Sequence, residues 1–328
     1  MSKDTTKEII TEPIPLQDAL ALSKRLMDEA LATTPAPFRP RTAYLTKSHG
    51  KFLRAQAVLI CAQDETGVKP AAAKAAAALE LLHLATLVHD DVIDEADTRR
   101  RQATLMKKFG SKQAVITGDY IFCLALRLAA EAAVNETDYS DDLPDIMEKI
   151  CMGELLQSIN HRNFGLSGIG YLRIISGKTA ALFEGSFFAG ASLCKMEDTE
   201  ARQYAAIGWH LGMVFQLADD CMDYEATKEE AQKPVLSDFE QGVVTLPLIV
   251  AIKQQPSVGQ RAVDGKITKE EVRQAVQKQG GTMFTKRVAR IYYDRAMRLL
   301  EGLNAPAFKK KQIALLLKTA TGTSISVA

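Results

Sequence analysis

Apolar residues recur at three- and four-residue spacing over long stretches of this chain, and no stretch sustains a two-residue alternation. Such spacing places the apolar side chains on one face of a helix. Proline fits the same interpretation, because it disrupts helix interiors and is missing from 71–143 and from 145–233. These intervals are also rich in Ala, Leu, Glu, Lys and Arg, which favour helix. The pattern predicts helices over 71–95, 112–134, 144–160, 171–193 and 198–225.

The breaks between these helices are short, so the sequence favours one packed unit. We predict an all-α fold, a single domain over residues 1–328 with long helices packed around a central cavity. Residues 226–242 are polar and contain a Lys-Pro step, which predicts a loop. Residues 1–12 and 319–328 are expected to be frayed tails.

Composition and charge narrow the functional classes. The net charge is +1 and the pI is about 7.6, so the protein has no strong positive electrostatic field that would attract nucleic acid. Five scattered cysteines lack CxxC spacing, which argues against a disulfide framework or a zinc site and for a reducing cytoplasm. The basic run 309–311 is expected to be a solvated helix end.

Nothing in the sequence indicates export or a membrane span. The first residues are polar and lack the apolar core of a signal peptide. No uncharged apolar run reaches the roughly 18 residues that a transmembrane helix needs. The run 71–88 comes nearest, but Lys74, Glu80 and His83 interrupt it. We therefore expect a cytoplasmic protein without a transmembrane segment.

One stretch combines an apolar helical run with a burst of charge. Residues 84–101 read LATLVHDDVIDEADTRRR, with Asp90, Asp91 and Asp94 at the junction. At about 100° per residue, these three carboxylates share one arc of about 100° on a helix. Like charges so close repel, and burial increases the repulsion, so a cation is expected among them. Carboxylate oxygens suit Mg²⁺, which also binds phosphate oxygens.

A second cluster has the same spacing. Asp219, Asp220 and Asp223 lie in FQLADDCMD, at the same offsets as the first three aspartates. A single cluster of this kind is typical of a solvated acidic face. Two clusters, each after an apolar run, predict facing carboxylate groups that hold Mg²⁺ ions with a diphosphate between them.

These motifs resemble those of the trans-polyprenyl diphosphate synthase family. DDVIDEADTRR over 90–100 is similar to the family's first aspartate-rich motif, and FQLADDCMD over 215–223 is similar to its second. The resemblance spans roughly residues 45–255 and implies an all-α isoprenoid-synthase fold, a homodimer, and three Mg²⁺ ions per site once substrate is bound. Further matches in family order are Gly50-Lys51-Phe52-Leu53-Arg54, Gly118-Asp119-Tyr120, Lys178-Thr179-Ala180, Lys233-Pro234 and Thr245-Leu246-Pro247.

The resemblance assigns residues to two diphosphate sites. Without it, Lys51 with Arg54 would be a surface pair, His83 a core residue and Lys178 an ordinary helix lysine. Ala55 and Gln232 stand where the family usually has Pro and Gly, so the match to the family's motifs is less exact at these positions. The implied isopentenyl diphosphate site comprises Lys51, Arg54, His83 and Arg100; the allylic diphosphate site comprises Arg99, Lys178, Thr179, Gln216 and Lys233; the metal ligands are Asp90, Asp94 and Asp219; and Asp91 and Asp220 complete the catalytic set.

The implied reaction is Mg²⁺-dependent elongation of an allylic diphosphate with isopentenyl diphosphate. Ala85 and Thr86, just before the first motif, are small where short-chain relatives tend to be bulky. This favours a long-chain (C30 or above) product, with a farnesyl or geranylgeranyl product as the alternative. Phe122 is a candidate for a deeper stop to the growing chain.

Two other functions remain open at this point. A terpene cyclase shares the first motif but usually carries an Asn/Ser/Glu metal motif second. A non-catalytic regulatory subunit typically lacks the aspartates. Both complete aspartate motifs favour the autonomous synthase over these two alternatives.

Overall fold

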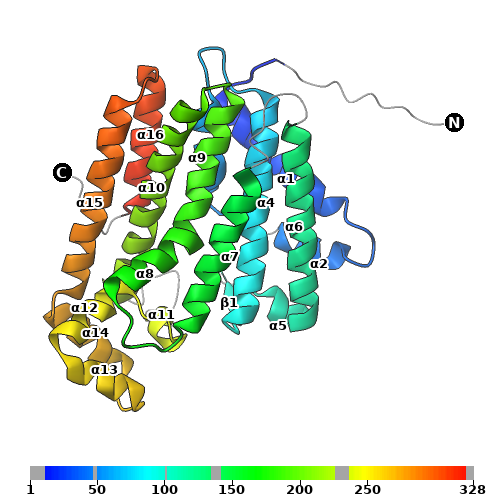
Figure 1. The fold of residues 1–328 in the computed structure, drawn as a ribbon. Coiled ribbons are helices and arrows are strands. Elements are labelled where there is room, and N and C mark those ends of the chain that lie inside the picture. Colours follow the sequence, from blue (N-terminus) through cyan, green and yellow to red (C-terminus); the bar gives the residue numbers. More distant parts are fainter. Residues whose placement is uncertain (1–11, 47–49, 100–101, 134–141, 226–235, 323–328) are drawn as a thin grey trace.

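The computed structural model describes residues 12–46, 50–99, 102–133, 142–225 and 236–322. In this part of the chain, helices follow one another and one two-stranded hairpin interrupts them (Figure 1). The first half contains α1 (Leu16–Ala32), α2 (Arg39–Leu45), α3 (Leu53–Ala62), α4 (Pro70–Ile93), β1 (Thr98–Arg99), β2 (Gln102–Ala103), α5 (Leu105–Phe109), α6 (Ser111–Ala133) and α7 (Leu143–Ile159).

The second half begins with one continuous helical rod and ends with two long outer helices. The rod is made of α8, a π-helical turn η2 and α9. The elements are α8 (Gly168–Ile175), η2 (Ser176–Ala180), α9 (Ala181–Leu193), α10 (Asp198–Glu225), α11 (Ser237–Glu240), α12 (Leu246–Gln254), α13 (Pro256–Val263), α14 (Lys269–Lys278), α15 (Gly281–Gly302) and α16 (Ala307–Ala320).

Helix α4 lies at the centre of one half of the bundle. Pro70 occupies its first turn, where the missing N–H costs no hydrogen bond. A run of buried alanines follows, and their small side chains let neighbouring helices approach closely. It packs against α6, α3, α1 and α9. The five long helices predicted from the spacing of apolar residues are confirmed, as is the all-α fold.

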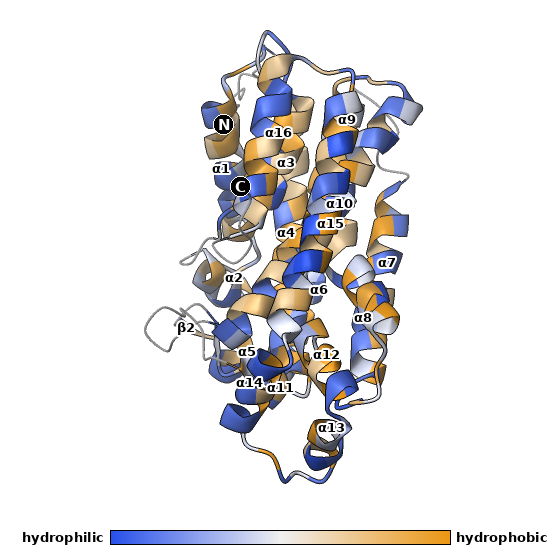
Figure 2. Cartoon of the chain, turned by 90° about the vertical axis from the view of Figure 1, so that its left-hand side faces the viewer, coloured by the Kyte–Doolittle hydropathy of each residue, from blue (hydrophilic) through white to orange (hydrophobic). Residues whose placement is uncertain are grey.

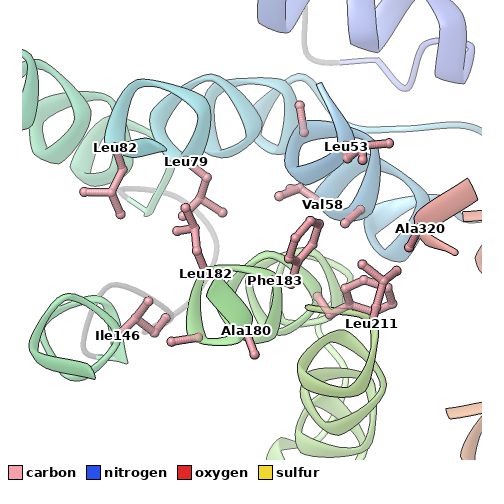
Figure 3. Close-up of a cluster of buried hydrophobic side chains, with 14 of the residues drawn as sticks. Leu53, Val58, Leu79, Leu82, Ile146, Ala180, Leu182, Phe183, Leu211 and Ala320 are labelled. Carbon is pink, nitrogen blue, oxygen red and sulfur yellow. The ribbon is translucent and has the colours of Figure 1, made fainter. Parts of the chain in front are cut away.

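A continuous hydrophobic core joins the two halves. Phe183 and Leu182 of α9 lie between Val58 of α3, Leu79 of α4 and Leu211 of α10 (Figure 3). Helix α10 in turn packs on α9 and α15. Figure 2 shows hydrophobic and hydrophilic residues on opposite sides of the outer helices, which is the pattern of amphipathic helices around a shared core.

Two predictions about the ends of elements were wrong. The tail prediction placed 319–328 outside the fold, but α16 continues to Ala320, which is buried in the core (Figure 3). Thr321 is buried as well, and its hydroxyl donates to the Lys318 carbonyl at 2.7 Å. The loop predicted over 226–242 contains the short helix α11. Residues 1–11, 226–235 and 323–328 lie outside the described residues.

By length and composition alone, α4 and α6 could cross a membrane. In the fold, the two helices pack against each other. The most apolar window of α4 is 67% buried and that of α6 is 44% buried. A buried core helix passes the same test of length and hydropathy, so these helices are weak evidence for a membrane span.

Candidate active site

The first aspartate cluster lies at the carboxyl end of α4. The side chains of Asp90 and Asp91 are 14% and 8% exposed, and burial raises the pKa of both carboxyls. The helix ends at Ile93, so Asp94 is its C-cap, and its N–H donates to the Asp90 carbonyl at 2.8 Å. Three carboxylates therefore gather where the helix ends, as their spacing predicted, in a setting that favours a cation partner.

A short hairpin returns an arginine to this cluster. Strands β1 and β2 pair antiparallel, and Arg99 on β1 donates through Nε to Asp91 Oδ1 at 2.7 Å. The predicted allylic diphosphate contact thus pairs with the second aspartate of the motif. Asp97 instead pairs with Lys107, whose Nζ donates to Asp97 Oδ2 at 3.0 Å. Arg100, the neighbouring predicted ligand, lies outside the described residues.

Lys178 reaches the same cluster from the π-helical turn η2. Gly153 of α7 and Gly177 of η2 allow the two backbones to touch, because a Cβ at Gly153 would lie 2.2 Å from the Lys178 nitrogen. This contact places Glu154 beside Lys178. The Lys178 Nζ donates to Glu154 Oε2 at 2.9 Å and lies 4.0 Å from Asp90 Oδ2.

The charges in this group depend on one another. Burial, with Asp90 nearby, raises the pKa of Glu154 to about 7, although Lys178 opposes the shift. Burial lowers the pKa of Lys178, but Asp90 and Glu154 outweigh it, so the pKa lies above its ordinary value. Lys178 is therefore a cation held between two carboxyls. The sequence predicted no role for Glu154, so this pairing was not expected.

The three aspartates of the second cluster have different surroundings. Asp219 is half-buried on α10. Asp220 is fully buried, and burial raises its pKa to about 7. Asp223 accepts from the Ser237 N–H at 3.1 Å and the Asp238 N–H at 3.3 Å, so its carboxylate anchors the first turn of α11. Equal spacing in the sequence does not give these three carboxylates equal surroundings.

A chain of hydrogen bonds connects this cluster to η2. Thr179 Oγ1 donates to Gln216 Oε1 at 2.8 Å, and Gln216 Nε2 donates to Asp220 Oδ1 at 3.0 Å. Tyr171 of α8, which is buried, donates its hydroxyl to Asp220 Oδ2. Thr179 and Gln216, which were both predicted for the allylic diphosphate site, therefore contact each other. Tyr171 was missed, because it lies 49 residues from its partner in the sequence.

Three of the residues predicted for the isopentenyl diphosphate site lie at the start of α3 and along α4. Lys51 is exposed just before Phe52, whose left-handed backbone (φ 53°) precedes α3. Arg54 lies with its guanidinium 4.5 Å from the ring centre of Phe183, and its buried Nε lacks a hydrogen-bond partner in the described structure. Burial lowers the pKa of Arg54 to about 10. His83 is half-buried, about two helical turns before the cluster's first aspartate.

The donor set fits a divalent cation. Among the described residues, no three His, Cys, Asp or Glu side chains already converge tightly enough to hold a metal ion. Asp90, Asp94 and Asp219 nevertheless supply hard carboxylate oxygens, which are the ligands that Mg²⁺ prefers. A buried Asp90 with a raised pKa, next to the Lys178 ammonium, is a carboxylate that a cation stabilises. Lys233 lies outside the described residues.

An apolar cavity lies beside the amino-terminal half of α4, whose carboxyl end carries the first aspartate cluster. The space among its lining side chains measures about 430 Å³, part of which is open to solvent. Leu79 and Leu82 of α4 and Ile146 of α7 point into the space between these helices and α9 (Figure 3). The remaining lining residues are Ala75, Ala78, Ala125, Leu126, Ala129, Leu143, Gly185, Phe188 and Ala189.

The predicted chain-length residues lie nearer the aspartates than this cavity. Ala85 is fully buried one turn after Leu82, and Thr86 donates its hydroxyl to the His83 carbonyl at 2.8 Å. Phe122 stacks on His89, with 5.7 Å between ring centres. Phe122 does not line the cavity, and its part in setting chain length stays a prediction.

The helical bundle, the two aspartate clusters joined through one lysine-bearing turn, and the apolar cavity define an all-α prenyltransferase. The chain belongs to the polyprenyl synthetase family, whose model matches residues 37–279.

Similar proteins have long products in their names. The chain is 32% identical over 292 residues to heptaprenyl diphosphate synthase component 2 of Geobacillus stearothermophilus, covering 88% of this chain and 91% of that protein. It is 30% identical over 279 residues to octaprenyl diphosphate synthase of Escherichia coli, covering 83% and 86%.

Solved structures agree with the fold. A decaprenyl diphosphate synthase from Rhodobacter capsulatus superposes with a TM-score of 0.86 at 27% identity, covering 95% of this chain and 98% of that one. A polyprenyl synthase from Caulobacter crescentus, complexed with calcium and isoprenyl diphosphate, has a TM-score of 0.84 at 29% identity, covering 94% and 95%. The second structure binds a divalent cation together with an isoprenyl diphosphate.

Proposed function

We propose that this chain is a long-chain (E)-polyprenyl diphosphate synthase, which condenses isopentenyl diphosphate with an allylic diphosphate. One observation carries the proposal: the turn that bears Lys178 and Thr179 connects the two aspartate clusters, since Lys178 lies 4.0 Å from Asp90 and Thr179 is linked to Asp220 through Gln216. An apolar cavity farther along α4 offers space for a hydrocarbon chain.

The reaction balances without a protein nucleophile. The allylic C–O bond breaks and its electron pair leaves with the diphosphate. The double bond of isopentenyl diphosphate then forms the new C–C bond, and a proton is lost from the adduct, with the released diphosphate as the proposed acceptor. Apolar walls around the site exclude water, which would otherwise quench the allylic cation.

Cationic side chains are proposed to stabilise the departing diphosphate. Asp90, Asp94 and Asp219 would hold Mg²⁺, three ions per site, which supplies Lewis-acid stabilisation of the leaving group. Lys178 adds a fixed positive charge in a buried setting, where it acts more strongly than in water. Arg99 is proposed to join it, as is Lys233, which lies outside the described residues.

The second diphosphate is proposed to bind at the start of α3. Arg54 is held against Phe183 before any ligand arrives, and its buried Nε has a donor to offer. A guanidinium binds phosphate oxygens in a bidentate manner, and Lys51 next to it adds a mobile charge. His83 and Arg100 complete the proposed isopentenyl diphosphate site.

The cavity supports a long product. Its nearest lining residue on α4, Leu82, lies eight residues before Asp90, a distance of about 12 Å along a helix. The cavity continues to Ala75, a further seven residues or about 10 Å. Ala85 and Thr86, between the aspartates and the cavity, are small, which favours a path for a growing chain. A farnesyl or geranylgeranyl product is the alternative if this path is closed in solution.

The domain organisation, cellular location and oligomeric state of the enzyme are further proposals. We propose a single-domain, cytoplasmic homodimer that binds no nucleic acid and releases a long product to a membrane. Exposed apolar residues on α6 and α7, among them Ile116, Leu155 and Ile159, support a contact between subunits. Both aspartate clusters are complete, which disfavours a terpene cyclase and a regulatory subunit.

The test is a product assay. The purified chain is incubated with Mg²⁺, isopentenyl diphosphate and dimethylallyl, geranyl or farnesyl diphosphate in separate reactions, and the dephosphorylated products are sized by mass spectrometry. We expect a ladder that ends at hexaprenyl or longer. Asp219→Ala is expected to abolish turnover, and Asp198→Ala, an exposed aspartate on the same helix, serves as the matched control. No condensation with any primer by a folded chain would refute an autonomous synthase.

A further inference from the structure

Positive charge is concentrated in the two outer helices α15 and α16. Residues 281–320, which span both helices, contain nine lysines and arginines and two acidic residues, which gives a net charge of +7. The whole chain has a net charge of +1, so the remaining residues together carry −6. The near-neutral total therefore does not describe the local field around these two helices.

The exposed cations of α15 lie along one side of the helix. Arg287, Arg295 and Arg298 are exposed, and at about 100° per residue they share an arc of about 80°. Ile291 lies within the same arc and is 51% exposed. This row extends over about 16 Å of helix, with one apolar side chain among the cations.

Helix α16 repeats the pattern beside it. Lys311 and Lys318 are exposed, and Leu315 between them is 64% exposed on the same side of the helix. The two helices pack against each other and lie on the side of the bundle that Figure 2 turns toward the viewer, away from α6 (Figure 1). The α15–α16 face consists of Arg287, Ile291, Arg295, Arg298, Lys311, Leu315 and Lys318.

Ion pairs do not neutralise this face within the part of the chain that the structure describes. On α15, Lys286 pairs with Glu225 at 2.7 Å. Arg290 pairs with Asp294 at 2.8 Å. The carboxylates near α15 thus pair with cations that do not belong to the face, and the charge of the face remains available to an anionic partner.

We propose that the α15–α16 face docks this protein on an anionic lipid bilayer. Its five cations attract the lipid phosphates, and Ile291 and Leu315 enter the boundary between headgroups and acyl chains. The inference rests on the proposed function for its purpose only, because a long polyprenyl chain is apolar and needs a bilayer to receive it.

Other partners fit the face less well. A second copy that used the same surface would bring like charges together across a two-fold axis. A nucleic acid attracts cations through its phosphates but offers no hydrocarbon layer to Ile291 and Leu315. The proposed subunit contact on α6 and α7 leaves the α15–α16 face uncovered.

The test is co-sedimentation of the purified chain with lipid vesicles in the absence of substrate. Vesicles of phosphatidylglycerol and phosphatidylcholine in equal amounts are the anionic probe, and vesicles of phosphatidylcholine alone are the neutral one. We expect binding to the anionic vesicles that weakens as salt is added, and no binding to the neutral vesicles. A chain that stays in solution with anionic vesicles at low salt would overturn the inference.

A triple variant, Arg287→Gln with Arg295→Gln and Arg298→Gln, removes the cations of α15. Glutamine suits an exposed helix about as well as arginine, so the fold is expected to persist. The affinity for anionic vesicles is expected to fall roughly a hundredfold, at about fivefold for each charge. An unchanged affinity would show that the face does not make the contact.

The matched control removes three exposed cations from the other side of the bundle. It combines Arg25→Gln, Arg39→Gln and Lys112→Gln, on α1, α2 and α6. The net charge falls by the same amount, and the affinity for anionic vesicles is expected to match that of the unmodified chain. Equal losses in the two triple variants would attribute binding to total charge and overturn the assignment to this face.

A third variant tests for lipid specifically. Ile291→Gln with Leu315→Gln keeps the charge of the face but removes its apolar side chains. We expect the affinity for anionic vesicles to fall about tenfold, because the two side chains no longer enter the bilayer. An unaffected affinity would leave a purely electrostatic contact, such as a nucleic acid or an acidic protein also makes, and the lipid assignment would fail.

Turnover separates this inference from the proposed function. None of the face residues belongs to the proposed substrate sites, so the α15 triple variant is expected to retain the kcat and KM of the unmodified chain with a short primer. An inactive unmodified chain that binds anionic vesicles defeats the proposed synthase alone. An active chain that does not bind them defeats this inference alone.

Discussion

The Lys178 ammonium lies 2.9 Å from a Glu154 oxygen and farther, 4.0 Å, from an oxygen of Asp90. Glu154 therefore holds the lysine to one side of the aspartate that is proposed to bind metal. The backbone contact at Gly153 and Gly177 makes this possible, because it places α7 directly against η2. A lysine held in this way contributes charge to the site while leaving Asp90 available to a cation.

Glu154→Gln is the first prediction. The amide still accepts a hydrogen bond but carries no charge, so Lys178 pairs more strongly with Asp90 and competes with Mg²⁺. We expect the Mg²⁺ concentration for half-maximal activity to rise roughly threefold. A rise of this size corresponds to somewhat less than the free energy of one pKa unit, which would be tenfold. Steady-state rates over a Mg²⁺ titration measure the shift.

The control for Glu154 is another ion pair between α7 and the rod made of α8, η2 and α9. Lys149 of α7 pairs with Glu184 of α9 at 3.1 Å, outside the aspartate clusters. Glu184→Gln removes an equivalent charge and is expected to leave the Mg²⁺ dependence as it was. Equal Mg²⁺ curves for Glu154→Gln and the unmodified enzyme would show that Glu154 does not regulate access to Asp90.

Chain length gives the second prediction. Ala78 lines the cavity, so Ala78→Phe fills it and the product ladder is expected to end several isoprene units earlier. Phe188→Ala enlarges the same cavity and is expected to lengthen the ladder. Mass spectrometry of the dephosphorylated products measures both effects.

The control for chain length is Val115→Phe on α6, where the side chain is 40% exposed and lies outside the cavity lining. Its product distribution is expected to match that of the unmodified enzyme. If Ala78→Phe keeps the original product length at normal turnover, the growing chain does not enter this cavity.

A buried lysine gives the third prediction. Lys309 is 2% exposed, donates to the Cys61 carbonyl at 2.9 Å and lies over the ring of Tyr204. Lys309→Met leaves that carbonyl at the end of α3 without its partner, which costs about 1–3 kcal/mol of unfolding free energy. Urea denaturation measures the loss. The exposed neighbour Lys311→Met is expected to change stability by less than about 0.5 kcal/mol.

The fourth prediction concerns pH. His210 is half-buried between Trp209 and Tyr292, and burial with Arg295 nearby lowers its pKa to about 4. Its folded pKa lies below the unfolded value of about 6.5, so the unfolded chain binds the proton first as pH falls. Stability from this group is fully present above pH 6.5 and is lost as the pH falls toward 4.

Comparison of His210→Phe with the unmodified enzyme isolates this effect. The unmodified chain is expected to lose more unfolding free energy between pH 7 and pH 5 than the variant does. The difference should stay below about 1.4 kcal/mol per pH unit, because the ring is only half-buried and solvent screens its charge. Parallel pH profiles of the two proteins would contradict the assignment.

The sequence predicted the long helices and the two acidic clusters well, because both depend on local spacing. It could not distinguish the aspartates of the second cluster. Neighbouring residues on a helix point about 100° apart, so Asp219 and Asp220 face different surroundings, and only packing decides which carboxylate is buried. The buried Asp220 carboxyl needs buried hydrogen-bond donors, but no local sequence pattern predicts that Tyr171, 49 residues away, is one of them.

The basic run at the C-terminal end shows the same limit. Lysines at 309–311 look like a solvated helix end, and Lys311 is exposed. Lys309 instead points into the core, where the end of α3 offers a carbonyl. The position of that carbonyl depends on a segment about 250 residues earlier, so no local pattern could reveal it.

The π-helical turn η2 shifts the directions in which the side chains of α9 point, relative to a rod that continued from α8 as a regular α-helix. A π-helical turn contains more residues than an α-helical turn. The spacing of 3.6 residues per turn is therefore interrupted at η2, and residues before and after it do not share one regular α-helical periodicity. Tyr171 contacts Asp220 of α10, and Phe183, farther along the same rod, contacts Arg54 of α3 as well as Phe215 of α10. Removal of a single residue from η2 would re-phase everything downstream by about 100°. Spacing between the tyrosine and the phenylalanine is thus as much a part of this site as the identity of either residue.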